Sequence, residues 1–181
     1  MKLNLGLKAA ISLATGIFIT FMQIHDQVIG LIALTTLALG WAAANLLAIF
    51  LSKNRISVLE SVPLIVIQAI FGVIALNSEL AIVQEPNSQI LQFSPFLILV
   101  ITWGFLSGAY DVWQAQLVGV KTGSGRDFLI SAALNFVLAA IFLIPGLDIV
   151  SAVGFLGAYS VLMGVHLGIS AATPAGSKNQ R

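Results

Sequence analysis

Long apolar segments dominate the pattern of this chain. Six apolar stretches follow one another and are separated by five short connections. A helix needs about 20 apolar residues to cross the hydrocarbon core of a bilayer, and each stretch approaches or exceeds that length. Lipid offers no partner to unpaired backbone groups, and the stretches are too long and too uniformly apolar for barrel strands. The predicted transmembrane helices lie near 5–22, 28–51, 56–76, 95–118, 127–144 and 149–172.

Local signals mark several helix ends. Ser94 followed by Pro95 is typical of an N-cap with proline at the first helical position. Ser124 stands three residues before Asp127, which resembles a capping box and predicts Ser124 as the cap of the fifth helix. The Pro-Gly pair at 145–146 ends that helix.

The basic residues alternate between connections. Every second connection and both tails carry Lys or Arg, and the other three connections carry none. Cytoplasmic loops retain positive charge, so the alternation predicts a multi-pass protein with both termini in the cytoplasm. The segment 77–91 is then the longest outer connection. The basic residues are Lys2, Lys8, Lys53, Arg55, Lys121, Arg126, Lys178 and Arg181.

Composition narrows the class of protein. Hydrophobic residues make up 59% of the chain and charged residues only 8%, whereas soluble domains carry about 25% charged residues. The fold class expected is therefore an all-α integral membrane bundle of six helices. The net charge of +1 provides no basic face for nucleic acid, and the absence of cysteine excludes thiolate metal sites and cysteine nucleophiles. We expect no enzyme activity, no cofactor and no metal, and we expect the lipid bilayer, further copies of the chain or other membrane proteins as partners.

An internal repeat divides the chain. Gly-Ala-Tyr at 108–110 recurs at 157–159, and in both copies another glycine follows eleven residues after the first. Gly-Trp-Ala at 40–42 is a weaker third copy. The repeat predicts three helical hairpins in one orientation, related by an axis along the membrane normal. They form one domain over 1–174, with hairpins at about 5–51, 56–118 and 127–172 and a short polar tail at 175–181.

Glycines also share faces of the fourth and sixth predicted helices. Lipid tails are as apolar as leucine, so membrane helices associate through close backbone approach at small residues. We expect ordinary packing within the molecule, and the alternative is a dimer interface or ligand groove. The glycines concerned are Gly104, Gly108, Gly157, Gly164 and Gly168.

The third hairpin resembles a known family. Leu-Ile-Pro-Gly at 143–146, Phe-Leu-Gly-Ala-Tyr at 155–159 and the later Gly164 are similar to the HdeD-like acid-resistance membrane proteins, which are built from three tandem two-helix repeats. The second hairpin matches through 108–111 and the first only in outline. The resemblance implies a bacterial inner-membrane protein linked to acid stress in some members, with no agreed molecular activity and no catalytic residues.

Polar residues inside the spans are the best functional candidates, because each is costly in hydrocarbon. Asp111 and His166, with Tyr110 or Tyr159, form a candidate proton-responsive cluster, since histidine titrates near neutral pH. The alternative is that Asp111 and His166 are interfacial or tie helices together. Three amides, which are more often interhelical ties than ligands, complete the candidates. They are Asn45, Gln68 and Asn135.

The outer connections carry only acidic charge. Asp26, Glu79, Glu85 and Asp148 would lose charge as the outside acidifies, although topology alone also predicts an outer face without Lys and Arg.

Three functions follow from these patterns. The leading hypothesis is a non-enzymatic membrane protein acting in envelope or acid stress. The first alternative is a small channel or transporter with a path lined by Gln68, Asn135, Asp111 and His166, and the second is a structural subunit of a larger membrane complex. Convergence of the polar side chains on a water-filled gap would favour transport.

Overall fold

The protein is a bundle of six helices. The computed structural model describes residues 2–51, 55–84 and 94–173, with the side chains of 55–61 excepted, and no strand occurs in that part of the chain. All six helices contain a segment long and apolar enough to cross a membrane, as the sequence predicted. The helices are α1 (Lys2–Phe21), α2 (Gln27–Leu51), α3 (Arg55–Gln84), α4 (Pro95–Val118), α5 (Gly123–Phe142) and α6 (Ile149–Ala172).

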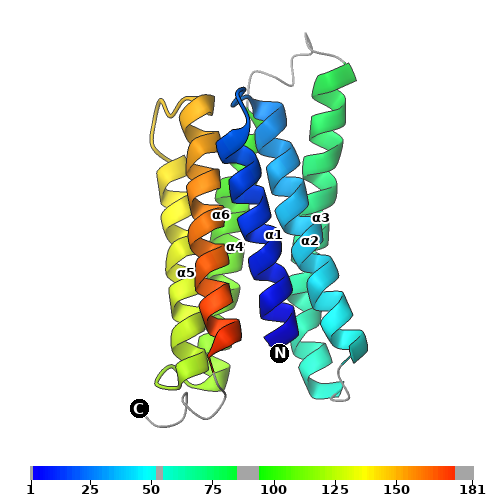
Figure 1. Ribbon diagram of the computed structural model, residues 1–181, viewed down its shortest axis with the longest axis vertical. Helices are drawn as coiled ribbons and strands as arrows, with labels where there is room; N and C mark the ends of the chain where they lie inside the picture. The colour runs from blue at the N-terminus through cyan, green and yellow to red at the C-terminus, as the bar shows by residue number, and fades with distance from the viewer. Residues whose placement is uncertain (1, 52–54, 85–93, 174–181) are drawn as a thin grey trace.

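The helices alternate in direction and lie side by side (Figure 1). α1 packs most closely on α6, α2 on α3, and α4 on α5, and α2 also contacts α4 and α6 across the interior. The hairpins expected as repeats, such as α3 with α4, are therefore not the pairs in closest contact. The repeat itself stays a prediction.

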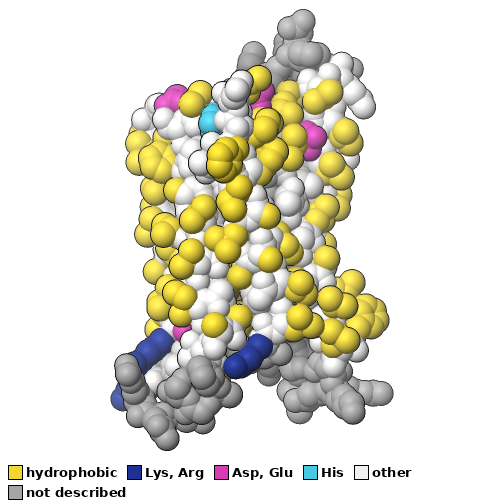
Figure 2. Space-filling model, viewed as in Figure 1, with side chains coloured by type: hydrophobic (Ala, Val, Ile, Leu, Met, Phe, Trp, Pro, Cys, Tyr) yellow, Lys and Arg dark blue, Asp and Glu magenta, His cyan; other side chains and the backbone are white. Residues whose placement is uncertain are grey.

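Charge separates the two ends of the bundle. The end where α1 and α5 begin carries the exposed side chains of Lys2, Lys121 and Arg126, and we name it the basic end. The opposite end carries Asp26 and Asp148, and we name it the acidic end. Figure 2 shows the Lys and Arg side chains gathered at one end and most Asp and Glu side chains toward the other.

Helix caps explain where several helices begin. Ser94 caps α4 as predicted, with Pro95 in the first turn. The prediction of Ser124 as the cap of α5 is wrong. Thr122 takes this role, and its hydroxyl accepts a hydrogen bond from the backbone N–H of Gly125 at 2.9 Å. Gly119, with φ of 89°, ends α4 and allows a tight turn. The residues from Gly123 onward therefore already form the first turn of α5.

The third helix is longer than predicted. It continues to Gln84 rather than ending at 76, and its membrane-crossing candidate is Val62–Gln84. The residues beyond 76 include no glycine or proline before Pro86, so nothing in this segment stops the helix. Asn77 fits within it by donating a side-chain hydrogen bond to the Val73 carbonyl at 2.9 Å. The predicted outer connection at 77–91 is therefore wrong in its first part, because 77–84 belong to α3. Glu85 lies outside the described residues.

Small residues lie in the closest helix contacts. A Cβ added at Gly104 would lie 2.8 Å from the backbone oxygen of Asn135 on α5, and one at Gly157 would lie 2.9 Å from Ile19 on α1. Gly108 similarly faces Phe136 on α5, and Gly164 faces Leu13 on α1. Gly168 is looser, with 3.8 Å to the Ala9 methyl group. These glycines lie in contacts within the molecule.

Large apolar side chains fill the interior toward the acidic end. Phe96 at the start of α4 and Phe142 at the end of α5 pack edge to face, with ring centroids 5.6 Å apart. Leu31 and Leu34 from α2 and Leu156 from α6 are fully buried around them. We call this group the apolar core. It closes one half of the bundle interior and leaves the polar side chains to the other half.

Candidate functional site

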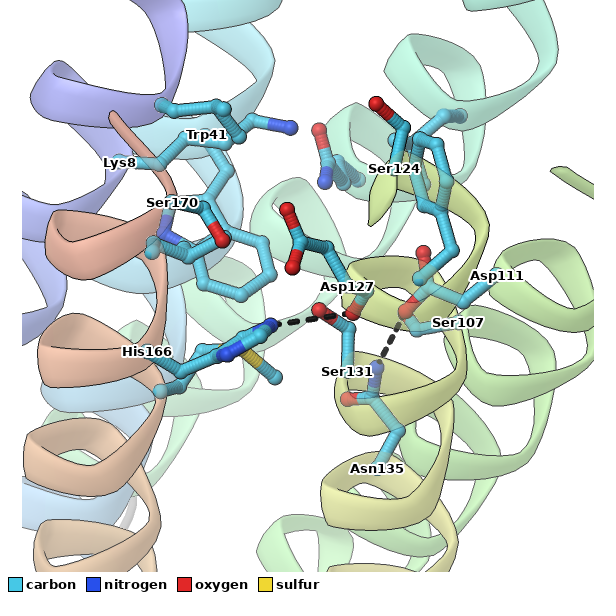
Figure 3. Close-up of a pocket in the computed structure, with 16 residues that line it drawn as sticks. Lys8, Trp41, Ser107, Asp111, Ser124, Asp127, Ser131, Asn135, His166 and Ser170 are labelled. Atoms are coloured by element: carbon cyan, nitrogen blue, oxygen red, sulfur yellow. Dashed lines mark hydrogen bonds between the residues drawn. The ribbon is translucent and has the colours of Figure 1, made fainter. Parts of the chain in front are cut away.

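A polar cavity lies inside the half of the bundle nearer the basic end. Its volume is about 80 Å³, and all six helices contribute to its wall. This volume holds several water molecules, since one water needs roughly 10–15 Å³ on this measure. Figure 3 shows the polar side chains of α1, α4, α5 and α6 around one space. The polar residues of the wall are Lys8, Trp41, Gln68, Ser107, Asp111, Ser124, Asp127, Ser131, Asn135, His166 and Ser170.

One wall holds a buried cation. The Lys8 ammonium lies 5.6 Å from the centre of the Trp41 ring, and Lys8 is only 9% exposed. The Trp41 indole N–H donates to the Ser12 hydroxyl at 3.1 Å, and that hydroxyl donates to the Lys8 backbone oxygen at 2.8 Å. These bonds fix the indole ring in place, so its face steers the ammonium by a cation–π attraction.

The facing wall holds a carboxylate in a hydrogen-bonded chain. The Tyr159 hydroxyl donates to the Asn135 side-chain oxygen at 2.7 Å, and the Asn135 amide donates to Asp111 at 2.9 Å. Tyr159 fixes which end of the Asn135 amide is the acceptor, so the amide N–H must face Asp111. Three helices thus cooperate in orienting one carboxylate.

His166 and Asp127 meet between α6 and α5. The Nε2 atom of His166 lies 3.0 Å from the backbone oxygen of Asp127. A carbonyl only accepts, so Nε2 carries the hydrogen and donates it to this oxygen. Figure 3 shows the Asp127 carboxylate projecting into the space between His166 and the α4 side chains.

Amides join the first three helices beside the cavity. The Asn4 amide donates to Asn45 at 2.9 Å, and the Asn45 amide donates to Gln68 at 2.8 Å. Asn45 and Gln68 are buried, so this chain satisfies groups that lipid cannot. Gln68 is its member on the cavity wall.

Two buried polar groups on α4 lack a partner within the described structure. The Ser107 hydroxyl lines the cavity, and Ser107 is 3% exposed. The Trp103 indole N–H, one turn away, is equally without a partner, and its ring packs edge to face on Trp41 at 5.9 Å. An unpaired buried polar group costs about 1–3 kcal/mol, so the site needs water or a solute to complete it.

The predicted site residues fall into three groups. Asp111, His166, Gln68 and Asn135 line the cavity. Tyr159 and Asn45 adjoin it through the hydrogen bonds already described. Tyr110 is separate, because it accepts a hydrogen bond from Gln114 on its own helix and packs on Trp113. Asp111 and His166 share the cavity but have different hydrogen-bond partners.

The sequence interpretation missed Lys8, Asp127 and Ser107. It used Lys8 only as one of the basic residues that indicate the cytoplasmic side, and it did not include Lys8 among the intramembrane candidates. This was wrong, because the Lys8 side chain is buried. A signal was present, since polar residues recur at helical spacing along α1 and α5 and mark one face of each. Those residues are Asn4, Lys8, Ser12 and Thr15, and Ser124, Asp127, Ser131 and Asn135.

The chemistry available is that of binding and proton exchange. Among the described side chains, no three of His, Asp or Glu are grouped to hold a metal ion. Opposite charges, hydroxyls and amides instead surround a small space, which suits a polar solute. No family model, curated protein or solved structure matches this chain, so the resemblance to the HdeD-like proteins stays a prediction.

Proposed function

We propose that this multi-pass membrane protein is a small transporter whose central cavity takes up a polar solute from the basic end of the bundle. A single observation carries the proposal, namely that ionisable and polar side chains from all six helices surround one cavity. In this proposal the basic end and both termini face the cytoplasm, as the positive-inside rule predicts. The activity is non-enzymatic.

The cost of these side chains supports a transport role over a purely structural one. Ionisable residues within membrane helices are costly and usually face the bundle interior or a water-filled cavity. Amides such as those of Asn45 and Gln68 tie helices together at lower cost. Lys8 and Asp111 line the cavity, and a solute pathway provides a functional reason for their burial.

The apolar core supports a carrier over an open channel. The cavity wall includes Leu5 and Ser124 in the first turns of α1 and α5, so it reaches toward the basic end. Phe96, Phe142 and Leu34 block the interior toward the acidic end. This form corresponds to an inward-open state, and release on the other side requires the apolar core to part.

Cysteine labelling tests whether water and solutes enter the cavity. The chain has no cysteine, so a single Ser107→Cys or Ser131→Cys substitution provides the only thiol. Both serines line the cavity, and we expect a small charged methanethiosulfonate reagent to modify either thiol in membrane vesicles. Modification should occur only when the reagent is on the same side as an N-terminal epitope tag.

Ser160→Cys is the matched control. Ser160 is fully buried, donates to the Leu156 carbonyl at 2.7 Å and does not belong to the cavity wall, so its replacement should stay unmodified. Equal resistance of all three thiols would contradict a wet cavity.

Reconstitution tests transport itself. Proteoliposomes are given radiolabelled rubidium ion, chloride and glycine in turn, and uptake is compared with that of protein-free liposomes. We expect uptake of at least one solute, reduced by Asp111→Asn and by His166→Ala because both side chains line the cavity. No uptake of any of the three by the wild-type protein would reject the transporter.

A further inference from the structure

We infer that the cavity selects a small dipolar solute, one that carries an anionic and a cationic group at once and is no larger than the smallest amino acids. This inference rests on the proposed transport function and names the substrate class. Its basis is the placement of opposite charges on facing walls of one small cavity.

The first wall suits an anionic group. Lys8 is a buried cation on the cavity wall, where its ammonium lies over the Trp41 indole ring and is attracted by Asp111. Cation–π attraction leaves ammonium hydrogens available, because a ring face satisfies only one side of the group. The Lys8 ammonium thus provides donors for a carboxylate on this side of the cavity.

The opposite wall suits a cationic group. Asp111 accepts its hydrogen bond from Asn135 through one carboxylate oxygen, Oδ2. Asp127 adds a second carboxylate on α5, and His166 stands beside it. An ammonium group of a solute would find carboxylate acceptors here at a position fixed by the Tyr159–Asn135 chain.

Singly charged solutes fit the same cavity poorly. An inorganic cation attracted to Asp111 would be repelled by Lys8, and an anion attracted to Lys8 would be repelled by Asp111 and Asp127. Each would also leave one of the two buried charges without an opposite charge from the solute beside it. A dipolar solute pairs with both walls simultaneously, and this complementarity provides the selectivity.

The size of the cavity limits the solute. A cavity of about 150 Å³ admits benzene, which has six non-hydrogen atoms. The volume here is about 80 Å³, so the solute must be smaller than benzene, and among amino acids glycine, with five non-hydrogen atoms, meets this limit. The rings of Trp41 and Trp103 pack against each other beside the cavity and restrict any expansion in their direction.

Binding to purified protein tests the inference. Titration calorimetry in detergent uses glycine, β-alanine and sarcosine as dipolar probes, and acetate and methylammonium as probes that carry only one of the two charges. We expect binding of at least one dipolar probe and none of the single-charge probes at equal concentration. Lys8→Gln and Asp111→Asn should each weaken the affinity more than about tenfold, because each removes the charge that pairs with one charged group of the solute.

Control variants separate charge from folding. Lys8→Arg keeps the positive charge and should retain most of the affinity, so loss in Lys8→Gln with retention in Lys8→Arg identifies the charge as the cause. Lys2→Gln and Asp26→Asn remove exposed charges of the same types and should leave the affinity unchanged. Size-exclusion profiles show whether each variant is folded.

The outcomes distinguish this inference from the proposed function. Uptake of rubidium or chloride without binding of any dipolar probe would overturn the inference and leave a transporter of another substrate class. Binding of acetate or methylammonium as strongly as glycine would also overturn it. Resistance of Ser107→Cys and Ser131→Cys to labelling would instead reject the wet cavity, and both proposals with it.

Discussion

The two halves of the bundle interior are built from the same six helices but have opposite character. Toward the acidic end, Phe96, Leu34 and Phe142 form a closed apolar core. Toward the basic end, the same helices surround a cavity with Lys8 and Asp111 on its walls. Packing in the first half holds the bundle together. The second half accepts the cost of buried charge, and this cost is the reason for proposing a functional site there.

The comparison also shows how few residues create a site in a membrane protein. All six helices are apolar along most of their length, and each passes the same test for a membrane span. The cavity arises because one or two polar residues on each helix face the same depth of the interior. Substitutions in the apolar half should therefore reduce stability, and those in the polar half should mainly reduce binding.

Phe96→Ala should give the largest loss of stability. Phe96 is fully buried against Phe142, and removing a buried phenylalanine ring costs about 3–5 kcal/mol. The free energy of unfolding is measured by titration with a denaturing detergent in mixed micelles. Phe21→Ala is the matched control, because Phe21 is 81% exposed and should lose little. Similar losses in the two variants would mean that the apolar core does not hold the bundle.

Gly104→Ala should have the next largest effect. The added methyl group would lie 2.8 Å from the Asn135 backbone oxygen, so α4 and α5 must separate, at a cost of about 1–3 kcal/mol. Gly154→Ala places the same methyl group where no atom lies within 4 Å, and alanine favours a helix by roughly 1 kcal/mol. The same unfolding titration compares them. Equal stability of the two variants would argue against close contact of α4 with α5.

The Tyr159–Asn135 bond should contribute less. Interhelical hydrogen bonds in membrane proteins average about 0.6 kcal/mol in double-mutant cycles, with about 1.7 as the maximum. A cycle of Tyr159→Phe and Asn135→Ala should return a coupling in that range, because the bond of 2.7 Å joins α6 to α5. Tyr110→Phe with Asn135→Ala is the control cycle and should show no coupling, since Tyr110 bonds to Gln114 instead. Coupling in the control alone would contradict the hydrogen-bonded chain.

Hydrophobic periodicity was sufficient for the fold and insufficient for the site. Six helices follow from segment length, and Ser94 was a correct cap because serine and proline leave little choice there. The end of α3 was missed since no breaker residue marks it before Pro86. In these cases local chemistry decides, and the sequence predicts well where that chemistry is unambiguous.

The site depends on which faces of the six helices pack together, and the local sequence of one helix does not determine this. Asp111 and His166 were recognised by their cost in lipid. Lys8 was missed because a lysine near a helix start also fits a cytoplasmic anchor, and only its packing against Trp41 decides between these roles. The cavity volume depends on all six helices at once. The polar spacing along α1 is the feature that would have favoured the buried position.

Asp148 offers the smallest effect and the clearest contrast with the acids of the cavity. It lies at the acidic end and caps α6, accepting hydrogen bonds from the backbone N–H and the hydroxyl of Ser151 at 2.9 and 2.7 Å. These bonds hold its pKa below the ordinary value of 3.8. A depressed pKa in the folded protein means that the carboxylate stabilises the fold above pH 3.8 and that this contribution is lost as the pH falls further.

Asp148→Asn should therefore be slightly less stable than the wild type at neutral pH, with a difference that shrinks below pH 3.8. Thermal unfolding across this pH range measures the difference, and Asp26→Asn is a comparison at the cap of α2, where Asp26 accepts from the Ile29 N–H. A difference that grows on acidification would contradict the assigned cap. Because Asp148 keeps its charge to lower pH than an ordinary aspartate, it is poorly suited to sense mild acid outside the cell.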